Sequence, residues 1–340
     1  MRIGLITGGG DCPGLNAVIR GAVLHGEESY GYSFVGYRGG WQGTTRGDIM
    51  PLTRRDVRGI SKVGGTIIGT SRTNPWESGG EDAVREVMRA NGIDAIMAIG
   101  GDGTLSVAKR LHEAGINIVG VPKTVDNDLN ATDMTFGFDT AVSIATEAMD
   151  RLRTTGDSHG RCMVAEVMGR HAGWIALHSG MAAGAHAILI PERRTTADEL
   201  VGWVESARAR GRAPLVVVAE GFVPAGAETA HSTKGNDAFG RPRLGGIGEQ
   251  VAELIEERTG IETRSTLLGH IQRGGVPTAF DRVLATRFGM RAVDLAAKGA
   301  WGEMVALRGT EMVDVSLDDA LGESKRVPEW RYLEAAQLFG

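Results

Sequence analysis

The chain has 340 residues, of which 42% are hydrophobic and 23% charged, and a formal net charge of −5. Its length exceeds one typical domain of about 100 to 200 residues, which predicts two domains or one large α/β unit. The acidic balance argues against a nucleic-acid-binding protein, which normally carries a basic surface. The two cysteines, Cys12 and Cys162, lack the spacing of a zinc site or a disulfide framework.

The N-terminal segment lacks the long apolar core of a signal peptide. No stretch reaches the roughly 18 consecutive apolar residues of a membrane span. We therefore expect a cytoplasmic protein.

Short apolar runs rich in β-branched residues predict buried strands at 3–6, 34–37, 95–99, 117–121, 162–167, 187–190 and 215–220. Strands that are apolar on both faces are typical of parallel sheets covered by helices on both sides. Helical spacing between them predicts helices at 81–92, 105–115 and 195–211, the last opened by a capping box from Thr196 to Glu199. This alternation predicts a doubly wound α/β protein that binds ligands at the carboxyl ends of its strands.

Two later segments depart from this rhythm. Residues 222–246 have little apolar periodicity and predict an exposed loop or a hairpin. From about residue 303, two strand-like pieces at 304–309 and 312–317 precede a polar helical tail.

Glycines, 51 in number, gather where apolar runs end, in TGGGDCPG (7–14), GGTIIGTSR (64–72) and IGGDGT (99–104). The first lies between a strand and a helix, where backbone N–H groups bind phosphate; a tight turn without a ligand is the alternative. Neither a dinucleotide fingerprint nor a Walker motif is present, which argues against a dehydrogenase and a P-loop ATPase. In the segment IGGDGT, Asp102 offers an oxygen ligand for Mg²⁺.

Charged side chains follow other strands. In VPKTVDNDL (121–129), Asp126 and Asp128 flank Asn127, either as a solvated acidic turn or as part of a site at the end of a buried strand. Arg72, Arg170 and the loop HIQRGG at 270–275 add cations at strand-to-loop junctions. Together these arginines favour a phosphate pocket, because the guanidinium group matches phosphate oxygens.

In this order and spacing, GGGDCPGLNAVIR, GGTxxGTSR, GGDGT, PKTVDND, EVMGRHAGW, AEG and LGHIQRGGxPTAFDR resemble the motifs of bacterial 6-phosphofructokinases, from residue 1 to about 290. GGDGT also occurs in lipid and NAD kinases, whereas PKTVDND together with HIQRGG is specific. The resemblance implies two doubly wound, Rossmann-like domains with mainly parallel sheets. The nucleotide-binding domain would span 1–137 and 272–322, and the fructose 6-phosphate-binding domain 138–271 and 323–340.

The resemblance also implies an activity and its residues. An allosteric enzyme of glycolysis would transfer the γ-phosphate of ATP to the 1-hydroxyl of fructose 6-phosphate, with Mg²⁺ on Asp102. Asp126 would be the general base, with Thr124 and Asp128 beside it, and Arg72 and Arg170 would stabilise charge on the phosphoryl group. The nucleotide would be bound by Gly10, Arg72, Gly103 and Thr104. The sugar phosphate would be bound by Thr124, Asp126, Asp128, Met168, Gly169, Arg170, Glu220, His270 and Arg273, with Arg161 and Arg264 contributed by a neighbouring subunit of a homo-oligomer, expected to be a tetramer.

The chain departs from the family pattern at the donor site. ATP-using members have a glycine where this chain has Lys123, and pyrophosphate-using relatives have an acidic residue where it has Gly103. An acidic side chain at 103 would block the α-phosphate of ATP, whereas a lysine can turn toward solvent or toward a neighbouring carboxylate. We therefore expect ATP as the donor, with pyrophosphate as the alternative. A non-catalytic sugar-phosphate sensor is a remote alternative. It is disfavoured because Asp102, Asp126 and Asp128 are all present.

The family's effector pocket is also altered. It expects arginines near 20 and 24 and a glutamate near 186, where this chain has Arg20, Leu24 and His186. Activation by ADP is therefore expected to be weak or absent.

Overall fold

The structure, a computed structural model, describes residues 1–228, 232–236 and 242–340. The chain divides into two compact units. Unit 1 consists of Met1–Val125, Leu129–Thr140 and Arg273–Glu323, and unit 2 of Asp126–Asp128, Ala141–Gln272 and Ser324–Gly340. That one domain binds the donor and the other the sugar phosphate remains a prediction.

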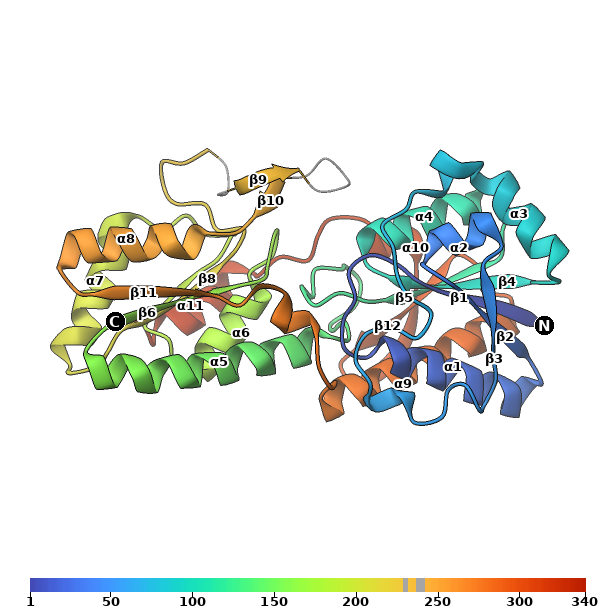
Figure 1. Ribbon diagram of the computed structural model, residues 1–340, viewed down its shortest axis with the longest axis horizontal. Coiled ribbons are helices and arrows are strands. Elements are labelled where there is room, and N and C mark those ends of the chain that lie inside the picture. The colour runs from blue at the N-terminus through green and yellow to red at the C-terminus, as the bar shows by residue number, and fades with distance from the viewer. Residues whose placement is uncertain (229–231, 237–241) are drawn as a thin grey trace. The chain divides into compact units, whose positions relative to one another are not determined.

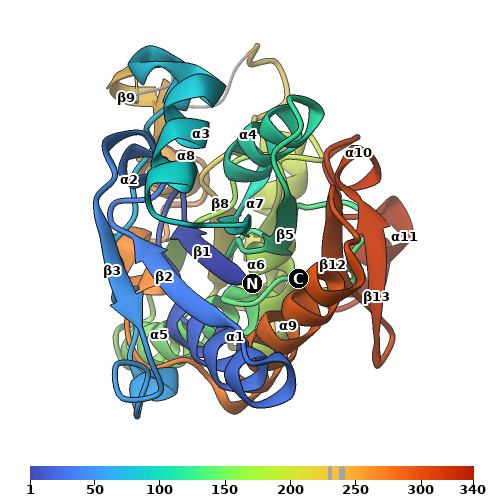
Figure 2. The same ribbon diagram turned by 90° about the vertical axis from the view of Figure 1, so that its right-hand side faces the viewer.

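Unit 1 is built on a sheet that has seven strands among the described residues, in the order β13-β12-β5-β4-β1-β2-β3. Figure 2 shows the labelled strands of this sheet in this order, from β13 at the right to β3 at the left, and β4 lies between β5 and β1. The inner strands are parallel, and the edge strands β3 and β13 are antiparallel to their neighbours. The strands are β1 (Arg2–Thr7), β2 (Ser33–Tyr37), β3 (Ile49–Leu52), β4 (Ala95–Gly100), β5 (Ile118–Pro122), β12 (Glu303–Arg308) and β13 (Glu311–Ser316).

Helices cover both faces of this sheet. Figure 1 shows α1 (Leu15–Tyr30) and α9 (Ala279–Lys298) on one face, and α2 (Trp41–Arg46), α3 (Gly80–Ala90) and α4 (Asp102–Glu113) on the other. Shorter elements are η1 (Ile60–Lys62), η2 (Pro75–Ser78) and α10 (Leu317–Ala320). All residues of β4 and β5 are buried, which explains why these strands are apolar throughout.

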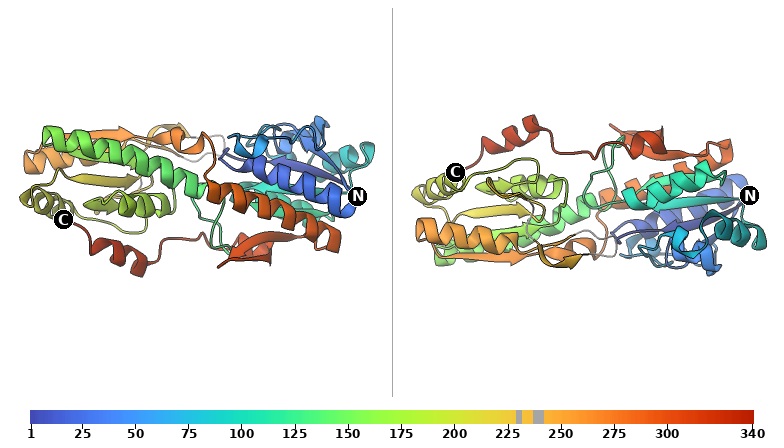
Figure 3. Two further views of the ribbon diagram at one scale, coloured as in Figure 1. Left: turned by 90° about the horizontal axis from the view of Figure 1, so that it is seen from below. Right: turned by 90° about the horizontal axis from the view of Figure 1, so that it is seen from above.

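Unit 2 contains a parallel sheet, four-stranded in the part of the chain that the structure describes, in the order β11-β6-β8-β7. The strands are β6 (Cys162–Val167), β7 (Ala187–Leu189), β8 (Leu215–Ala219) and β11 (Thr263–Leu267). Helices α7 (Ala197–Ala209) and α8 (Ile247–Thr259) cover one face, and α5 (Phe138–His159) and α6 (Trp174–Ala182) the other (Figure 1). The C-terminal α11 (Glu329–Ala336), red in Figure 3, packs on α6.

The predicted fold class is confirmed: both units are α/β, with mainly parallel sheets between helical layers. Each predicted strand is present within one or two residues, and Thr196 and Glu199 form the predicted capping box of α7. In the irregular segment, β9 (Ser232–Asn236) and β10 (Pro242–Leu244) pair antiparallel, as in the predicted hairpin. The rest of that prediction, at 229–231 and 237–241, lies outside the described residues. No helix in the described ranges is long and apolar enough to cross a membrane.

A buried carboxylate joins the first turns of α5 and α9. The Thr278 hydroxyl caps α9 by accepting a hydrogen bond from the Asp281 N–H (3.2 Å). Asp281 Oδ2 accepts hydrogen bonds from the backbone N–H (2.8 Å) and the hydroxyl (2.5 Å) of Thr140 in α5. Burial raises the pKa of Asp281 to about 6 from an ordinary value of 3.8. The folded chain therefore binds a proton at this carboxyl more readily than the unfolded chain does.

We predict that this carboxylate makes stability depend on pH. Because its pKa is raised in the folded state, its contribution to stability is full below about pH 4 and is lost as the pH rises through about 6. Relative to Asp281→Asn, the wild type should gain on the order of 2 kcal/mol of unfolding free energy as the pH falls through this window. Urea unfolding of both proteins between pH 4 and 8 measures this difference. The exposed Asp150→Asn is the control for loss of one carboxylate, and parallel pH profiles for wild type and Asp281→Asn would refute the prediction.

Candidate active site

The first set of predicted site residues lies in unit 1, at the carboxyl ends of β1, β4 and β5. These strands are neighbours and parallel, so the turns that follow them share one edge of the sheet. The Gly8 N–H donates to the Ile99 carbonyl at 3.0 Å, and the Lys123 N–H donates to the Gly100 carbonyl at 2.9 Å. The glycine turn, the Gly-Asp-Gly turn and the start of the Lys-Thr-Val-Asp loop are thereby brought together.

The turn that carries Arg72 joins the same edge. The Gly9 N–H donates to the Ser71 carbonyl at 3.0 Å, and the Thr70 hydroxyl donates to the Gly9 carbonyl at 2.7 Å. The Arg72 side chain, which follows directly, is exposed. Unit 1 therefore offers an accessible cation at the edge of the sheet where α4 begins, and a cation near a helix N-terminus is suited to phosphate.

Helix α4 begins at this edge with the predicted metal and donor residues. Asp102 and Gly103 are exposed in its first turn, whereas Thr104 is buried. A Cβ on Gly8 would lie 2.4 Å from Thr104 Oγ1, so only glycine lets β1 approach α4 this closely. A Cβ on Gly103 would meet nothing within 4 Å. The two glycines therefore have different physical roles, one in packing and one in leaving space.

The side chain of Lys123 does not have the expected orientation toward solvent. Its side chain is 3% exposed, and Nζ donates a hydrogen bond to the Gly10 carbonyl at 2.6 Å. Nζ also lies 3.5 Å from the Cβ position of Gly9. Of the two expected orientations, the one toward solvent is therefore wrong, because the ammonium group is buried and held against the glycine turn.

Asp102 is suited to Mg²⁺ shared with phosphate. Among the described residues no group of three or more His, Cys, Asp or Glu side chains could hold a metal ion. Mg²⁺ in phosphoryl-transfer sites usually keeps several waters and takes one or two carboxylates plus substrate phosphates. The single exposed carboxylate of Asp102, in the first turn of α4, fits a Mg²⁺ ion that is shared with substrate phosphates. It does not fit a metal ion held by protein side chains alone.

Unit 2 holds the predicted base and most of the predicted sugar-phosphate residues. Asp126 and Asp128 are half-buried, and Asn127 between them is 3% exposed with a φ of 52°. The Lys325 N–H donates to the Asp128 carbonyl at 2.9 Å, which joins this loop to the segment before α11. Thr124 belongs to unit 1, where its carbonyl accepts a hydrogen bond from the Thr135 hydroxyl at 2.7 Å.

Met168, Gly169 and Arg170 follow β6, and Glu220 follows its neighbour β8. The Glu220 N–H donates to the Val167 carbonyl at 2.9 Å, and the Gly221 N–H donates to the Gly169 carbonyl at 3.1 Å. A Cβ on Gly221 would lie 2.0 Å from the Arg170 carbonyl oxygen, which accounts for the glycine in the AEG motif. The structure therefore brings these sugar-phosphate residues together at the carboxyl ends of β6 and β8.

The HIQRGG motif forms the short helix η3 (Gly269–Arg273), which follows β11. Its exposed His270 therefore comes after the strand that pairs with β6. Gln272, which the sequence analysis did not single out, is fully buried and accepts a hydrogen bond from the Met168 N–H through Oε1 at 3.3 Å. Arg273 lies in unit 1, where NH1 donates to the Asp11 carbonyl of the glycine turn at 3.3 Å.

Arg161 and Arg264 lie at the other end of the same sheet. Arg161 immediately precedes β6, and Arg264 is the second residue of β11, beside Met163 in the register. Arg161 Nε forms an ion pair with Glu262 Oε2 at 2.9 Å, and Arg264 also pairs with Glu262. The six residues of β6 span roughly 20 Å. The two arginines are therefore remote from Met168, Arg170 and Glu220 of their own chain.

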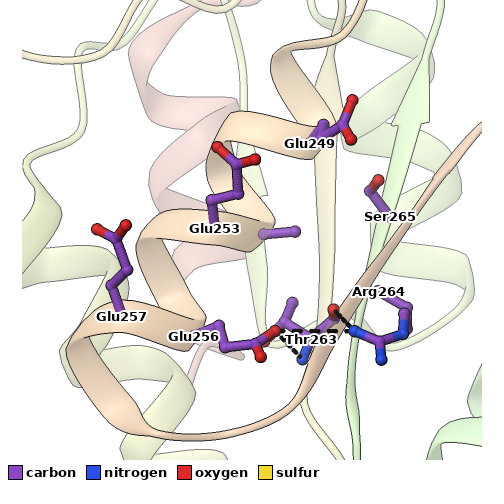
Figure 4. Close-up of a pocket in the computed structure, with 8 residues that line it drawn as sticks. Glu249, Glu253, Glu256, Glu257, Thr263, Arg264 and Ser265 are labelled. Carbon is purple, nitrogen blue, oxygen red and sulfur yellow. Dashed lines mark hydrogen bonds and ion pairs between the residues drawn. The ribbon is translucent and has the colours of Figure 1, made fainter.

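Arg264 also lies beside a row of glutamates. Figure 4 shows it across from α8, in a groove of about 490 Å³ lined by Glu249, Glu253, Glu256, Glu257, Thr263, Arg264 and Ser265 among others. Arg264 NH1 lies 3.8 Å from Glu256 Oε2. The arginine is thus exposed and paired with acidic side chains of its own unit.

The altered effector position is uncharged at neutral pH. His186 is 8% exposed, and its Nδ1 accepts a hydrogen bond from the Leu215 N–H at 3.0 Å. Burial, together with nearby Arg153, Arg210 and Arg212, lowers the pKa of His186 to about 4. A neutral imidazole cannot replace the charge of the glutamate expected there. Weak ADP activation stays a prediction.

Fold and residues together are those of a doubly wound α/β phosphotransferase. The family model described as phosphofructokinase matches residues 2–296. The chain therefore belongs to the phosphofructokinase family.

Similar proteins differ in the donor that their names give. The pyrophosphate–fructose 6-phosphate 1-phosphotransferase of Amycolatopsis mediterranei (strain S699) is 59% identical over 100% of both chains. The ATP-dependent 6-phosphofructokinase 3 of Streptomyces coelicolor is 52% identical over 98% of this chain and 99% of that protein. The crystal structure of Pichia pastoris phosphofructokinase in the T-state has a TM-score of 0.83 and 34% identity, covering 94% of this chain and 35% of that longer one. Membership of the family implies phosphofructokinase activity. It does not identify the phosphoryl donor.

The two glycines near the donor edge should respond differently to alanine. Gly8→Ala should lower the melting temperature by several degrees, because its Cβ collides with Thr104. Gly103→Ala should leave the melting temperature nearly unchanged, because open space surrounds the new methyl group. Thermal unfolding followed by circular dichroism checks both variants. Equal effects of the two substitutions would contradict this assignment.

Proposed function

We propose that this chain transfers a phosphoryl group from pyrophosphate to the 1-hydroxyl of fructose 6-phosphate in the cytoplasm. The observation that carries the choice of donor is the fixed ammonium of Lys123 at the glycine turn. The names of relatives such as the 59% identical Amycolatopsis protein support it.

The two donors differ in the groups that they offer for binding. Pyrophosphate has no nucleoside, so its affinity has to come from contacts with its phosphates and their metal ion. A charge-assisted hydrogen bond is about twice as strong as a neutral one. A lysine that is already buried and held loses little conformational entropy when it binds an anion. Lys123 therefore favours a small, highly charged donor.

ATP is the second candidate, favoured by Gly103. The open space at its Cβ position would accommodate a larger donor. The ATP-dependent name of the 52% identical Streptomyces protein is consistent with this candidate. ATP was the donor expected from the sequence, on the premise that Lys123 could turn away.

In the proposed mechanism, Asp126 accepts the proton of the 1-hydroxyl as that oxygen attacks the terminal phosphorus of the donor. The bond from this phosphorus to the bridging oxygen breaks, and phosphate leaves when pyrophosphate is the donor, or ADP when ATP is the donor. Mg²⁺ held by Asp102 would neutralise phosphate charge. Arg72 and Arg170 would stabilise the charge that develops on the transferred group. Met168, Gly169, Glu220, His270 and Arg273 would bind the sugar phosphate, with Thr124 and Asp128 beside the base. The backbone at Gly10, Gly103 and Thr104 would line the donor site.

A homo-oligomer with shared sites is part of this proposal. Arg161 and Arg264 lie at the amino ends of β6 and β11, whereas the other sugar-phosphate residues of unit 2 follow the carboxyl ends of strands. This separation supports a role for both arginines in the site of a neighbouring subunit. A tetramer is the expected assembly.

The choice of donor is tested by comparing pyrophosphate with ATP, in the wild type and in a variant without the charge of Lys123. With fructose 6-phosphate and Mg²⁺ saturating, the wild type should have the higher kcat/KM with pyrophosphate. Lys123→Met, which keeps length and removes charge, should lower that value roughly 10- to 100-fold, the loss typical of one hydrogen bond to a charged group. The value with ATP should change little.

Gly103→Asp is the matched test of the second candidate. If ATP is the donor, the added carboxylate should greatly reduce ATP-dependent kcat/KM, because it repels the nucleotide's phosphates. A wild type that is faster with ATP than with pyrophosphate, and that retains its rate as Lys123→Met, would overturn the choice of pyrophosphate.

The base prediction tests catalysis itself. Asp126→Ser should lower kcat roughly 10²- to 10⁴-fold, as expected when a general base is lost. The melting temperature should change little, because a half-buried loop carboxylate contributes little packing. Turnover near that of the wild type would remove Asp126 from this role. A wild type that binds fructose 6-phosphate in calorimetry, with turnover by neither donor, would instead favour the non-catalytic sensor.

A further inference from the structure

The segment before α11 holds the loop that carries the proposed base. The Lys325 N–H donates to the Asp128 carbonyl (2.9 Å), and the Lys325 ammonium donates to Asn127 Oδ1 (3.0 Å). The Ser324 hydroxyl also donates to the Asp128 carbonyl (3.3 Å). Lys325 therefore contacts the loop through both its backbone and its side chain, from nearly two hundred positions further along the chain.

The loop has a conformation that needs such support. Asn127 has a φ of 52°, in the left-handed region, which asparagine enters more readily than most residues but which is uncommon for any residue other than glycine. A non-glycine residue persists there when the surrounding structure holds it in place. The Lys325 ammonium binds the amide oxygen of this residue, directly between the two aspartates. The contact therefore holds the turn from which both carboxylates project.

The same segment is fixed to the start of α6. Trp174 Nε1 donates a hydrogen bond to the Lys325 carbonyl at 2.9 Å. The half-buried carboxylate of Glu192 accepts from both the Val327 N–H (2.9 Å) and the Gly173 N–H (3.0 Å). Helix α6 begins four residues after Arg170. Residues 324–327 thus connect the base loop to the helix that follows the Met168–Arg170 segment, entirely within unit 2.

We propose that Lys325 is a positioning residue for phosphoryl transfer, which fixes the loop Asp126–Asp128 to the start of α6. It acts through Asn127 and Asp128, and it has no role as acid, base or ligand. This inference rests on the proposed function, because it takes Asp126 as the base. A loop fixed in this way keeps the base in the narrow range of geometry that proton transfer requires.

The test measures kcat and KM with fructose 6-phosphate, Mg²⁺ and whichever of pyrophosphate and ATP the wild type uses faster. Lys325→Met keeps the length of the side chain and removes its charge and its donor. It should lower kcat roughly 10- to 100-fold, the cost of a misplaced catalytic group, with the KM for fructose 6-phosphate within about threefold of the wild-type value. Lys325→Arg keeps a cationic donor and should recover much of the loss. Lys298→Met, at an exposed lysine of α9, is the matched control and should leave kcat unchanged.

A double-mutant cycle identifies the contact. Asn127→Ala removes the acceptor, so the double variant with Lys325→Met should lose no more kcat than the more damaging single variant. Losses that multiply, or a higher KM with unchanged kcat, would overturn the proposal. If Lys325→Met fails to fold, Trp174→Phe removes one hydrogen bond from the same segment and should lower kcat in the same direction; an unchanged kcat would overturn the proposal.

Asp126→Ser, assayed in parallel, separates this inference from the proposed function. If Asp126→Ser retains turnover, the assignment of the base fails, whatever the result at Lys325. If Asp126→Ser loses turnover and Lys325→Met retains it, the positioning role alone fails. If Lys325→Met loses turnover, and combining it with Asp126→Ser lowers turnover no further than Asp126→Ser alone, the result supports both the assignment of the base and the positioning role.

Discussion

The parallel pairing of neighbouring strands is the constraint on which the site depends. Hydrogen bonds between β1, β4 and β5 align their carboxyl ends, so three turns that are far apart in the sequence share one edge. The same pairing of β6 with β8 joins Met168–Arg170 to Glu220. Most residues of the candidate site lie in the turns or at the helix starts that follow these strands, so their positions follow from the register of the strand before them. A doubly wound sheet thereby makes a binding edge from short loops.

Two glycines and a buried lysine add to the arrangement that the strands produce. Gly8 and Gly221 allow backbone and side chains to approach within distances that no Cβ would permit. Lys123 then adds a cation that is fixed by Gly10 instead of being free in solvent. A lysine side chain fixed at this edge supports the proposal of a small anionic donor.

The two ends of the sheet in unit 2 differ in the residues they carry. Met168, Arg170 and Glu220 follow the carboxyl ends, whereas Arg161 and Arg264 pair with Glu262 at the amino ends. Strand length alone separates the two groups, so one chain cannot use both on one ligand at these positions. This separation supports the proposal that neighbouring subunits share sites, and it follows from which residue of each strand is an arginine.

The sequence by itself determined the fold class, the buried strands and most of the candidate site. Continuous apolar runs identify parallel strands, and motifs in turns predict which residues bind phosphate and sugar. It did not reveal β11, because TRSTL is a largely exposed edge strand without an apolar pattern. Only the tertiary structure decided that Lys123 is buried, that Gln272 binds the Met168 N–H, and that Lys325 reaches Asn127. These contacts join residues up to 198 positions apart, and a local pattern carries no information about such partners.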